Sequence, residues 1–249
     1  MFPIMAMTQR FRASHMDHHW HVNDPERDPD LRRLNIPEPQ PFPVSKPGFW
    51  HRYVVRALLW PPALVRYLFG QAKHANLAVD EGPAIRSLYR FKLGRVMRGA
   101  YGIAVLSVVH YFHAWPLFLL FWVLPLLTSY PMLMQLREIA HHSNAPDDGD
   151  LTNSRVFRVN PLWNACVFPC GQDFHVTHQL FAMLPHYRMA QAHAILMRNP
   201  GYRESVVICR GFFFRAIGTA GPSVLEVLAR KPGPGELVWA GGLPVAAEA

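Results

Sequence analysis

The sequence predicts an all-α integral membrane protein, in which a transmembrane helical hairpin is joined to a cytoplasmic helical domain rich in histidine. Three observations support this fold class. Residues 99 to 135 are thirty-seven positions without one Asp, Glu, Lys or Arg. Charged residues make up 17% of the chain, against roughly 25% in ordinary soluble domains. Finally, there are 14 histidines, eight of which fall in three tight clusters.

The uncharged segment from 99 to 135 predicts the hairpin. A membrane-spanning helix takes about 20 residues, so this segment is long for one span and sufficient for two short ones. The uncharged residues 113 to 116 are the expected turn, and Pro125 is expected to kink the second span. Basic residues, among them Arg98 and Arg137, flank both ends and mark the cytoplasmic side. A hairpin with both ends in the cytoplasm is therefore favoured, and a single tilted span is the alternative.

The remaining segments predict one domain over residues 1 to 230 and a flexible, Gly- and Pro-rich tail over 231 to 249. Residues 49 to 70 mix aromatic, apolar and arginine side chains, which suits a helix at a membrane interface or a soluble amphipathic helix. Residues 162 to 170 and 207 to 218 are apolar and too short to span a bilayer. Contact with the membrane surface and packing against the cytoplasmic domain are both open for these two segments.

Several classes of function have no support in the sequence. Three cysteines in 249 residues exclude a disulfide framework and a four-cysteine zinc site. The patterns typical of dinucleotide binding, of phosphate-binding loops and of serine hydrolases are missing. The formal charge is +8, but the basic residues flank apolar segments, so we expect anionic lipid and an acidic electron donor as partners and no nucleic acid.

Two histidine clusters have the spacing of a metal site on a helix. His15, His18 and His19 form H-x-x-H-H, and positions i, i+3 and i+4 share one helical face. His175 and His178 repeat this spacing, with Gln179 in the last place. The clusters lie on either side of the predicted hairpin, which would return both to the same membrane face.

A third cluster, His141 and His142, follows the second predicted span at the point where the helix should emerge into water. Glu138 stands four residues before His142 on the same helical face. A donor set of several imidazoles and a few oxygens is typical of non-haem iron or zinc. The three clusters together therefore predict a metal site on one side of a membrane.

These motifs resemble the membrane-bound fatty acid desaturases. The first cluster, running into Asn23-Asp24-Pro25 and Asp28-Pro29, resembles the second histidine box of that family and the N-D-P-x-x-D-P tail that often follows it. The segment from 136 to 142 resembles the end of the fourth transmembrane helix. Residues 175 to 193 are similar to the third box and its continuation. The resemblance covers about residues 11 to 197.

The resemblance implies a di-iron site on the cytoplasmic face that uses O2 and two external electrons to remove hydrogen from an acyl chain. It implies a membrane lipid environment and a small electron-donor protein of the ferredoxin, rubredoxin or cytochrome b5 type. It implies no catalytic residue beyond the metal ligands. The implied iron ligands are six histidines: His15, His18, His19, His142, His175 and His178. Three further residues, Glu138, His141 and Gln179, match positions that could bind the metal or support a ligand.

The sequence departs from the family pattern at four places. Gln179 replaces a ligand histidine, His141 stands where glutamate is usual, and Ser143 stands where glycine is usual. The first box, H-x-x-x-H, is expected some thirty residues upstream of the second, and only fourteen residues precede His15. We therefore expect either an N-terminally incomplete desaturase-like domain or a degenerate relative, and poor or no activity for these residues alone.

The sequence leaves three functions open. The first is an O2-dependent desaturase-like oxidoreductase of lipid metabolism. The second is a lipid or carotenoid hydroxylase or ketolase on the same scaffold. The third is a non-catalytic membrane relative that keeps the fold without the metal.

Overall fold

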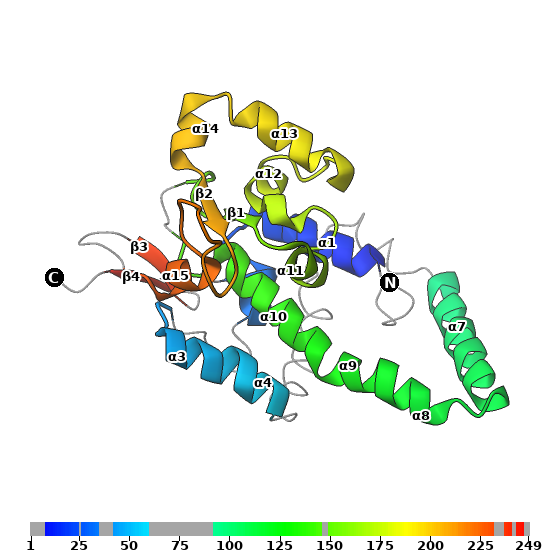
Figure 1. Ribbon diagram of the computed structural model, residues 1–249. Coiled ribbons are helices and arrows are strands. Elements are labelled where there is room, and N and C mark those ends of the chain that lie inside the picture. The colour runs from blue at the N-terminus through cyan, green and yellow to red at the C-terminus, as the bar shows by residue number, and fades with distance from the viewer. Residues whose placement is uncertain are drawn as a thin grey trace.

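The structure is a computed structural model that describes residues 8–24, 26–34, 42–59, 92–145, 149–231, 237–240 and 243–246. These residues are mostly helical and form a body from which two long helical arms project (Figure 1). The helices before the arms are α1 (Thr8–Trp20), α2 (Pro29–Leu34), α3 (Lys46–Phe49), η2 (Trp50–Val55) and α4 (Arg56–Leu59). The arms comprise α7 (Lys92–Tyr111), α8 (Trp115–Phe118), η3 (Leu119–Val123), α9 (Leu124–Leu127) and α10 (Ser129–His142). The helices after the arms are α11 (Pro161–Val167), η4 (Gln172–Phe174), α12 (His175–Leu180), η5 (His186–Arg188), α13 (Met189–Leu196), α14 (Pro200–Ser205) and α15 (Val224–Ala229).

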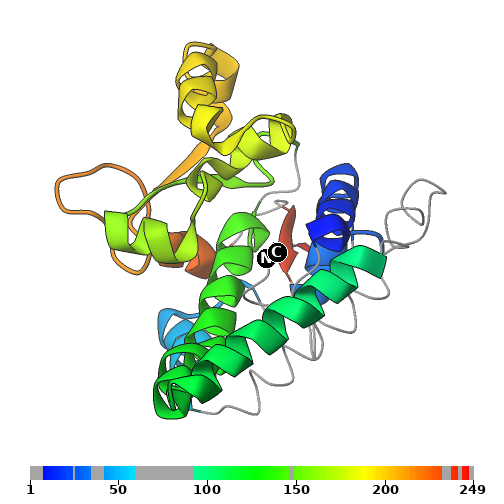
Figure 2. The same cartoon turned by 90° about the vertical axis from the view of Figure 1, so that its right-hand side faces the viewer.

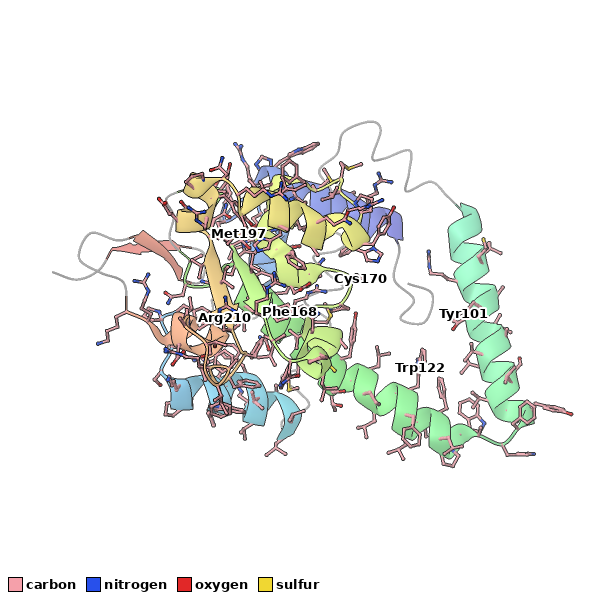
Figure 3. The ribbon with its side chains drawn as sticks, turned by 45° about the horizontal axis from the view of Figure 1, so that its top comes forward. Tyr101, Trp122, Phe168, Cys170, Met197 and Arg210 are labelled. Carbon is pink, nitrogen blue, oxygen red and sulfur yellow. The ribbon has the colours of Figure 1, made fainter. Side chains whose placement is uncertain are left out.

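The two arms meet at residues 112–114, which overlap the turn predicted at 113 to 116, although residues 115 and 116 already belong to α8. The first arm, α7, ends at Tyr111, and the second begins with α8 at Trp115. His113 in the turn adopts a left-handed conformation with φ 50°. Figure 3 shows Tyr101 on the first arm and Trp122 on the second, both clear of the body that holds Phe168 and Arg210.

Only the second arm qualifies as a membrane span among the described helices. It runs as one rod of 28 residues from Trp115 to His142. Only 11% of its most apolar 18-residue stretch is buried. Its large apolar side chains are exposed, including Leu117 at 60% and Phe121 at 70%. The first arm carries Lys92, Arg95 and Arg98 in its first two turns. The predicted pair of spans is therefore supported for one arm.

Two prolines distort the second arm. Pro125 and Pro131 each remove a backbone donor and crowd the carbonyl four residues earlier. The rod responds with the π-helical segment η3 before Pro125 and with non-helical angles at Thr128 (φ −127°, ψ −82°). The Thr128 hydroxyl donates to the Leu124 carbonyl at 2.7 Å, so a displaced carbonyl keeps a partner. The rod is thus irregular on both sides of Pro125, the position at which a kink is predicted.

The body is built around the C-terminal half of α10. Leu136, Ile139 and Ala140 on this helix are at most 1% exposed. They belong to one apolar cluster with aromatic residues of α3, η2, β1 and the segment after α11, namely Phe49, Tyr53, Phe157 and Phe168. The helix α10 ends the candidate span and also contributes side chains to the core. The direction of the second arm therefore determines where the body lies relative to it.

Short strands are the departure from the all-α prediction. β1 (Arg155–Arg158) pairs in parallel with β2 (Val207–Arg210), and Val156, Phe157 and Cys209 are fully or almost fully buried there. In β1 the adjacent residues Val156 and Phe157 point to opposite faces and are both buried, so both faces of this strand are covered. Within the predicted flexible tail, β3 (Leu237–Ala240) and β4 (Leu243–Ala246) pair antiparallel.

A buried arginine joins β1 to the end of α10. Arg155 is 1% exposed, and its guanidinium donates to the Ala140 carbonyl at 2.7 Å and to the Ser143 carbonyl at 2.6 Å. Burial lowers the pKa of Arg155 to about 10, so the group stays charged at neutral pH. The last carbonyls of a helix carry partial negative charge, which this cation neutralises. Arg155 thus holds the helix end that carries His141 and His142.

Replacing this arginine tests its structural role. In Arg155→Met the Ala140 and Ser143 carbonyls lose their donors, but removal of a buried charge offsets part of this loss. We therefore expect the free energy of unfolding to fall by about 2 kcal/mol. Denaturant unfolding of the purified chain in detergent measures the change. The matched control is Arg158→Met on the same strand, which loses an exposed contact with the Phe174 ring and should fall by less than about 1 kcal/mol. Equal losses for both variants would contradict the role given to Arg155.

Candidate metal centre

The first histidine cluster lies on one helix, as predicted. α1 carries His15, His18 and His19, and it ends at Trp20, after which Asn23 adopts φ 63°. Asparagine tolerates this left-handed conformation, which is a common way to end a helix. The chain can then turn back toward α1 and begin α2.

The second cluster lies on the short helix α12. Gly171 precedes it with φ +76°, and a Cβ there would lie 3.0 Å from the His186 carbonyl oxygen, so the turn requires glycine. Val176 and Thr177 on α12 are fully buried. The Thr177 hydroxyl lies 3.3 Å from the Tyr202 hydroxyl, which also lies 3.0 Å from His193 Nδ1. His193 therefore supports α12 from behind, and its side chain is engaged away from the histidine clusters.

Three imidazoles from α1 and α12 form the first candidate ligand set. His15 Nε2 lies 2.8 Å from His178 Nε2, and His19 Nε2 lies 3.0 Å from His178 Nε2 and 3.3 Å from His15 Nε2. At these distances the Nε2 atoms either share protons in hydrogen bonds, depending on the tautomer of each ring, or direct their lone pairs at one cation. The arrangement suits a cation that accepts three nitrogen lone pairs.

The second candidate set combines three helices. His18 of α1, His142 of α10 and His175 of α12 offer ligand atoms within 4.8 Å of one another. His142 Nε2 lies 3.0 Å from His175 Nε2. The Gln179 amide lies 3.0 Å from His18 Nε2 and 3.2 Å from His175 Nε2, so Gln179 belongs to this set. Its nitrogen and oxygen can exchange places by rotation of the amide.

The two sets lie side by side because the first and second clusters each contribute to both. The first and third histidines of H-x-x-H-H enter the first set, and the middle one enters the second. Likewise, His178 enters the first set while His175 enters the second. The ring centroids of His15 and His18 are 5.9 Å apart, and those of His175 and His178 are 5.6 Å apart. Two cations held by these sets would be close neighbours.

A buried carboxylate orients His18. Asp28 is 1% exposed, and its Oδ1 accepts from His18 Nδ1 at 2.8 Å. The same carboxylate accepts backbone hydrogen bonds from Asn23, Asp30 and Leu31, so it also caps α2 ahead of Pro29. Since Nδ1 of His18 donates to Asp28, its Nε2 is the nitrogen that points toward the second set. A carboxylate behind a metal-binding histidine is a common support of such sites.

A backbone hydrogen bond and burial determine the protonation states of the other imidazoles. His142 Nδ1 lies 3.0 Å from the Asn153 carbonyl oxygen, which keeps its proton on Nδ1 and leaves Nε2 free. Burial, helped by neighbouring histidines, lowers the pKa of His19 to about 3 and that of His178 to about 4. Burial also lowers the pKa of His175. These imidazoles are neutral at pH 7 and therefore able to donate lone pairs to a metal.

His18 is the exception among them. Burial lowers the pKa of His18, but the fields of Asp30 and Asp28 and the hydrogen bond to Asp28 outweigh it and raise the pKa to about 9. Without a metal, His18 is protonated at pH 7. Metal binding at its Nε2 therefore has to release a proton.

Two predicted supporting residues lie beside the ligand sets. His141 stacks on His175 at 3.6 Å between ring centroids and packs near Phe157 and Phe168, so its ring faces the core. Glu138 pairs with Arg137. Neither belongs to a three-ligand group among the described residues. His141 therefore buttresses His175, and Glu138 contributes negative charge near the sets.

A small cavity of about 30 Å³ adjoins the ligands, with room for one or two molecules of the size of water. It is lined by four of the predicted ligand residues and by both charged residues of the Arg137–Glu138 pair. The lining residues are Phe11, His15, His18, Asp30, Arg137, Glu138, His141, His142, Gln172 and His175. The ligand sets thus have an open side where a small molecule can approach.

Sequence spacing alone did not identify Asp28 and the Asn153 carbonyl as supports. Asp28 was visible only as part of the tail after the first cluster, and no helical spacing relates it to His18, ten residues earlier. Asn153 acts through its backbone, which leaves no signal in residue type. Arg155 likewise shows its role only once its burial is known.

The residues present fit a site for two metal ions with mainly nitrogen ligands. Each set offers three imidazoles whose Nε2 atoms converge, and an amide joins the second set. Histidine-dominated sets with a few oxygens suit iron, zinc or manganese. The described side chains could therefore hold metal ions of this kind.

Comparison with known proteins places the chain in a family. The family model described as "Fatty acid desaturase" matches residues 1–211. The dihydrorhizobitoxine desaturase of Bradyrhizobium elkanii is 26% identical over 252 residues, an alignment that covers 92% of this chain and 65% of that protein. The chain thus spans just under two thirds of the length of that relative. No solved structure matches. Because the match extends from residue 1 through all three histidine clusters, the chain belongs to the fatty acid desaturase family.

Proposed function

We propose that this chain is a membrane-bound, O2-dependent desaturase-like oxidoreductase that holds two iron ions and acts on an acyl chain. The observation that carries the proposal is the pair of adjacent three-histidine sets shared by α1 and α12. One set alone would also suit a single structural zinc ion. Two neighbouring sets favour a pair of redox metal ions.

The chain's own residues prepare the site for iron. His15, His19 and His178 would hold one ion, and His18, His142 and His175 the other, with the Gln179 amide beside it. Bound iron would supply the activation of O2 and the removal of two hydrogens from the substrate. Asp28 holds His18 in the tautomer that binds through Nε2, and the Asn153 carbonyl does the same for His142. The adjoining cavity gives a molecule the size of O2 a place next to the ligands.

Membrane attachment would place this site within reach of acyl chains. The second arm, Trp115–His142, is long and apolar enough to cross a bilayer and ends at His142, a proposed ligand. We place the histidine sets on the cytoplasmic side, because basic residues flank the uncharged segment. Labelling of single cysteines at residues 21 and 179 from either side of sealed vesicles tests this. Labels reacting from opposite sides would overturn the shared site.

Electrons would come from a small acidic redox protein of the ferredoxin, rubredoxin or cytochrome b5 type. The exposed arginines of the segment after α12, Arg188, Arg198 and Arg203, give such a donor a complementary surface. The net charge of +8 favours the same partner.

Iron content and product mass together test the proposed function. We expect the purified full chain, expressed in iron-rich medium, to carry about two iron ions by plasma mass spectrometry. In line with the poor activity expected of these residues alone, lipid extracts of expressing cells should contain a small excess, over control cells, of acyl chains lighter by two hydrogens. A product heavier by one oxygen would assign the hydroxylase alternative instead. A chain that stays iron-free and leaves lipids unchanged would be the non-catalytic relative.

Replacing Gln179 by histidine tests the second set, because it adds an imidazole to that set. In Gln179→His an imidazole replaces the amide that lies 3.0 Å from His18 Nε2, so we expect iron to leave about tenfold more slowly under a chelator. In Gln179→Leu the donor is lost, and iron should leave faster than from the unchanged chain. The control is Gln191→His, because Gln191 is exposed and pairs with Arg188. Equal release from the His and Leu variants would show that Gln179 lies outside the metal's reach.

A further inference from the structure

The loop between β2 and α15 exposes two large apolar side chains. Phe214 is 76% exposed and Ile217 is fully exposed, at 102%. Figure 2 shows this loop as the orange trace that projects from the left of the body. Between residues 206 and 225 there is no acidic residue; the segment contains Arg210 and Arg215, of which Arg215 pairs with Glu226 of α15 at 3.3 Å. An exposed apolar tip of this kind marks a surface that another phase or molecule covers.

The loop is built to hold this tip in place. At its base, Arg210 N donates to the Pro222 carbonyl at 2.7 Å, and Ala216 N donates to the Arg210 carbonyl at 2.9 Å. Gly211 has φ +100°, and a Cβ there would lie 1.9 Å from the Phe214 carbonyl oxygen, so the turn requires glycine. The exposure of Phe214 and Ile217 therefore follows from a closed, hydrogen-bonded loop.

An aromatic cluster attaches the loop next to the candidate span. The Phe213 ring stacks on Trp50 at 4.3 Å and lies edge-on to Trp163 at 5.0 Å. Trp50 is on η2 and Trp163 is on α11, and both elements pack against α10. In the same apolar cluster, α10 contributes Met132 and Leu136, around the end of the uncharged segment at residue 135. The loop thus starts at the level where the span would leave the bilayer.

Further exposed apolar residues flank this level. Leu59 at the end of α4 is 75% exposed, and Leu162 on α11 is 73% exposed. Tryptophan rings are enriched at the boundary between acyl chains and headgroups, and arginines such as Arg52 and Arg56 bind anionic headgroups there. These exposed apolar residues therefore lie on elements that contact α10, and together with the tryptophans and arginines they have the composition of an interface.

We infer that Phe214 and Ile217 insert into the headgroup–acyl boundary of a phospholipid bilayer and form a second membrane contact beside the end of α10. This inference rests on the proposed membrane attachment through the second arm. It assigns the tip of the segment 207 to 218 to the membrane surface, whereas Cys209 and Phe212 of the same segment pack in the core of the body. A second contact would fix the tilt of the body over the bilayer, which a single span leaves free.

Lipid quenching of single labels tests the loop. The full chain is placed in nanodiscs of phosphatidylcholine and phosphatidylglycerol, after replacement of the exposed Cys166 and Cys170 by serine. An environment-sensitive fluorophore is then attached at Phe214→Cys or Ile217→Cys, and spin-labelled lipid is added. The negative control is Ile195→Cys on α13, which is 62% exposed and lies on the far side of the body from α8 (Figure 1). The positive control is Phe121→Cys in the span.

We expect quenching at positions 214 and 217 to exceed that at position 195 at least threefold, with blue-shifted emission. Quenching at position 121 but not at 214 or 217 would overturn the loop contact while leaving membrane attachment intact. Absence of quenching at position 121 would overturn the attachment and the loop contact with it. Emission at 214 that is blue-shifted in detergent and insensitive to spin-labelled lipid would indicate cover by protein, which also overturns the inference.

Discussion

Replacing His178 by alanine should remove one of the two iron ions that we propose for this chain. His178 Nε2 lies 2.8 Å from His15 and 3.0 Å from His19, so it is the contact through which α12 completes the first set. Without it, both remaining ligands come from one turn of α1. We expect iron per chain to fall from about two to about one and product formation to fall about 100-fold or more, because two ligands rarely retain a metal that needs three.

The control for this variant is His186→Ala. His186 lies on η5, close in sequence to His178, and is exposed and outside both sets. Iron content and product formation should stay within twofold of those of the unchanged chain. If His178→Ala kept as much iron as the control, His178 would not help to hold a metal ion in the first set. Loss of both ions from His178→Ala, with an unchanged unfolding midpoint, would show that the two sets bind cooperatively.

Replacing Asp28 should weaken the second set without removing a ligand. In Asp28→Ala, His18 loses the acceptor of its Nδ1 proton, and three backbone donors lose theirs. We expect metal affinity to fall by 10- to 100-fold, about the loss usual for such supports. The free energy of unfolding of the metal-free chain should fall by about 3 kcal/mol, because buried donors are left unpaired. Competition with a chromophoric chelator and denaturant unfolding measure the two effects.

A graded comparison separates orientation from folding. Asp28→Asn keeps the shape and one acceptor oxygen, so it should lie between the unchanged chain and Asp28→Ala in both measurements. The control is Asp17→Asn, which removes a carboxylate from α1 that lies 3.8 Å from His21 and outside the sets. If metal affinity fell equally in Asp28→Asn and Asp17→Asn, Asp28 would act only through its negative charge and not by orienting His18.

The sequence was sufficient for local features of this protein. The spacing of His15, His18 and His19 placed them on one helical face, because an α-helix repeats every 3.6 residues whatever surrounds it. The long uncharged segment predicted an apolar rod and its turn near residue 113, since length and composition alone determine what can cross a bilayer. The second span is supported on these grounds, and the first is not, because charged residues occupy the first turns of α7.

Only the tertiary structure decided which nitrogens meet. His15 and His178 are 163 positions apart, and their contact depends on how α1 and α12 pack around the end of α10. That packing divides the first and second clusters between the two sets, turns His141 toward the core and brings Asp28 behind His18. Helical periodicity determines the face on which a side chain lies, whereas the partner across that face depends on contacts between distant segments, which no local spacing encodes.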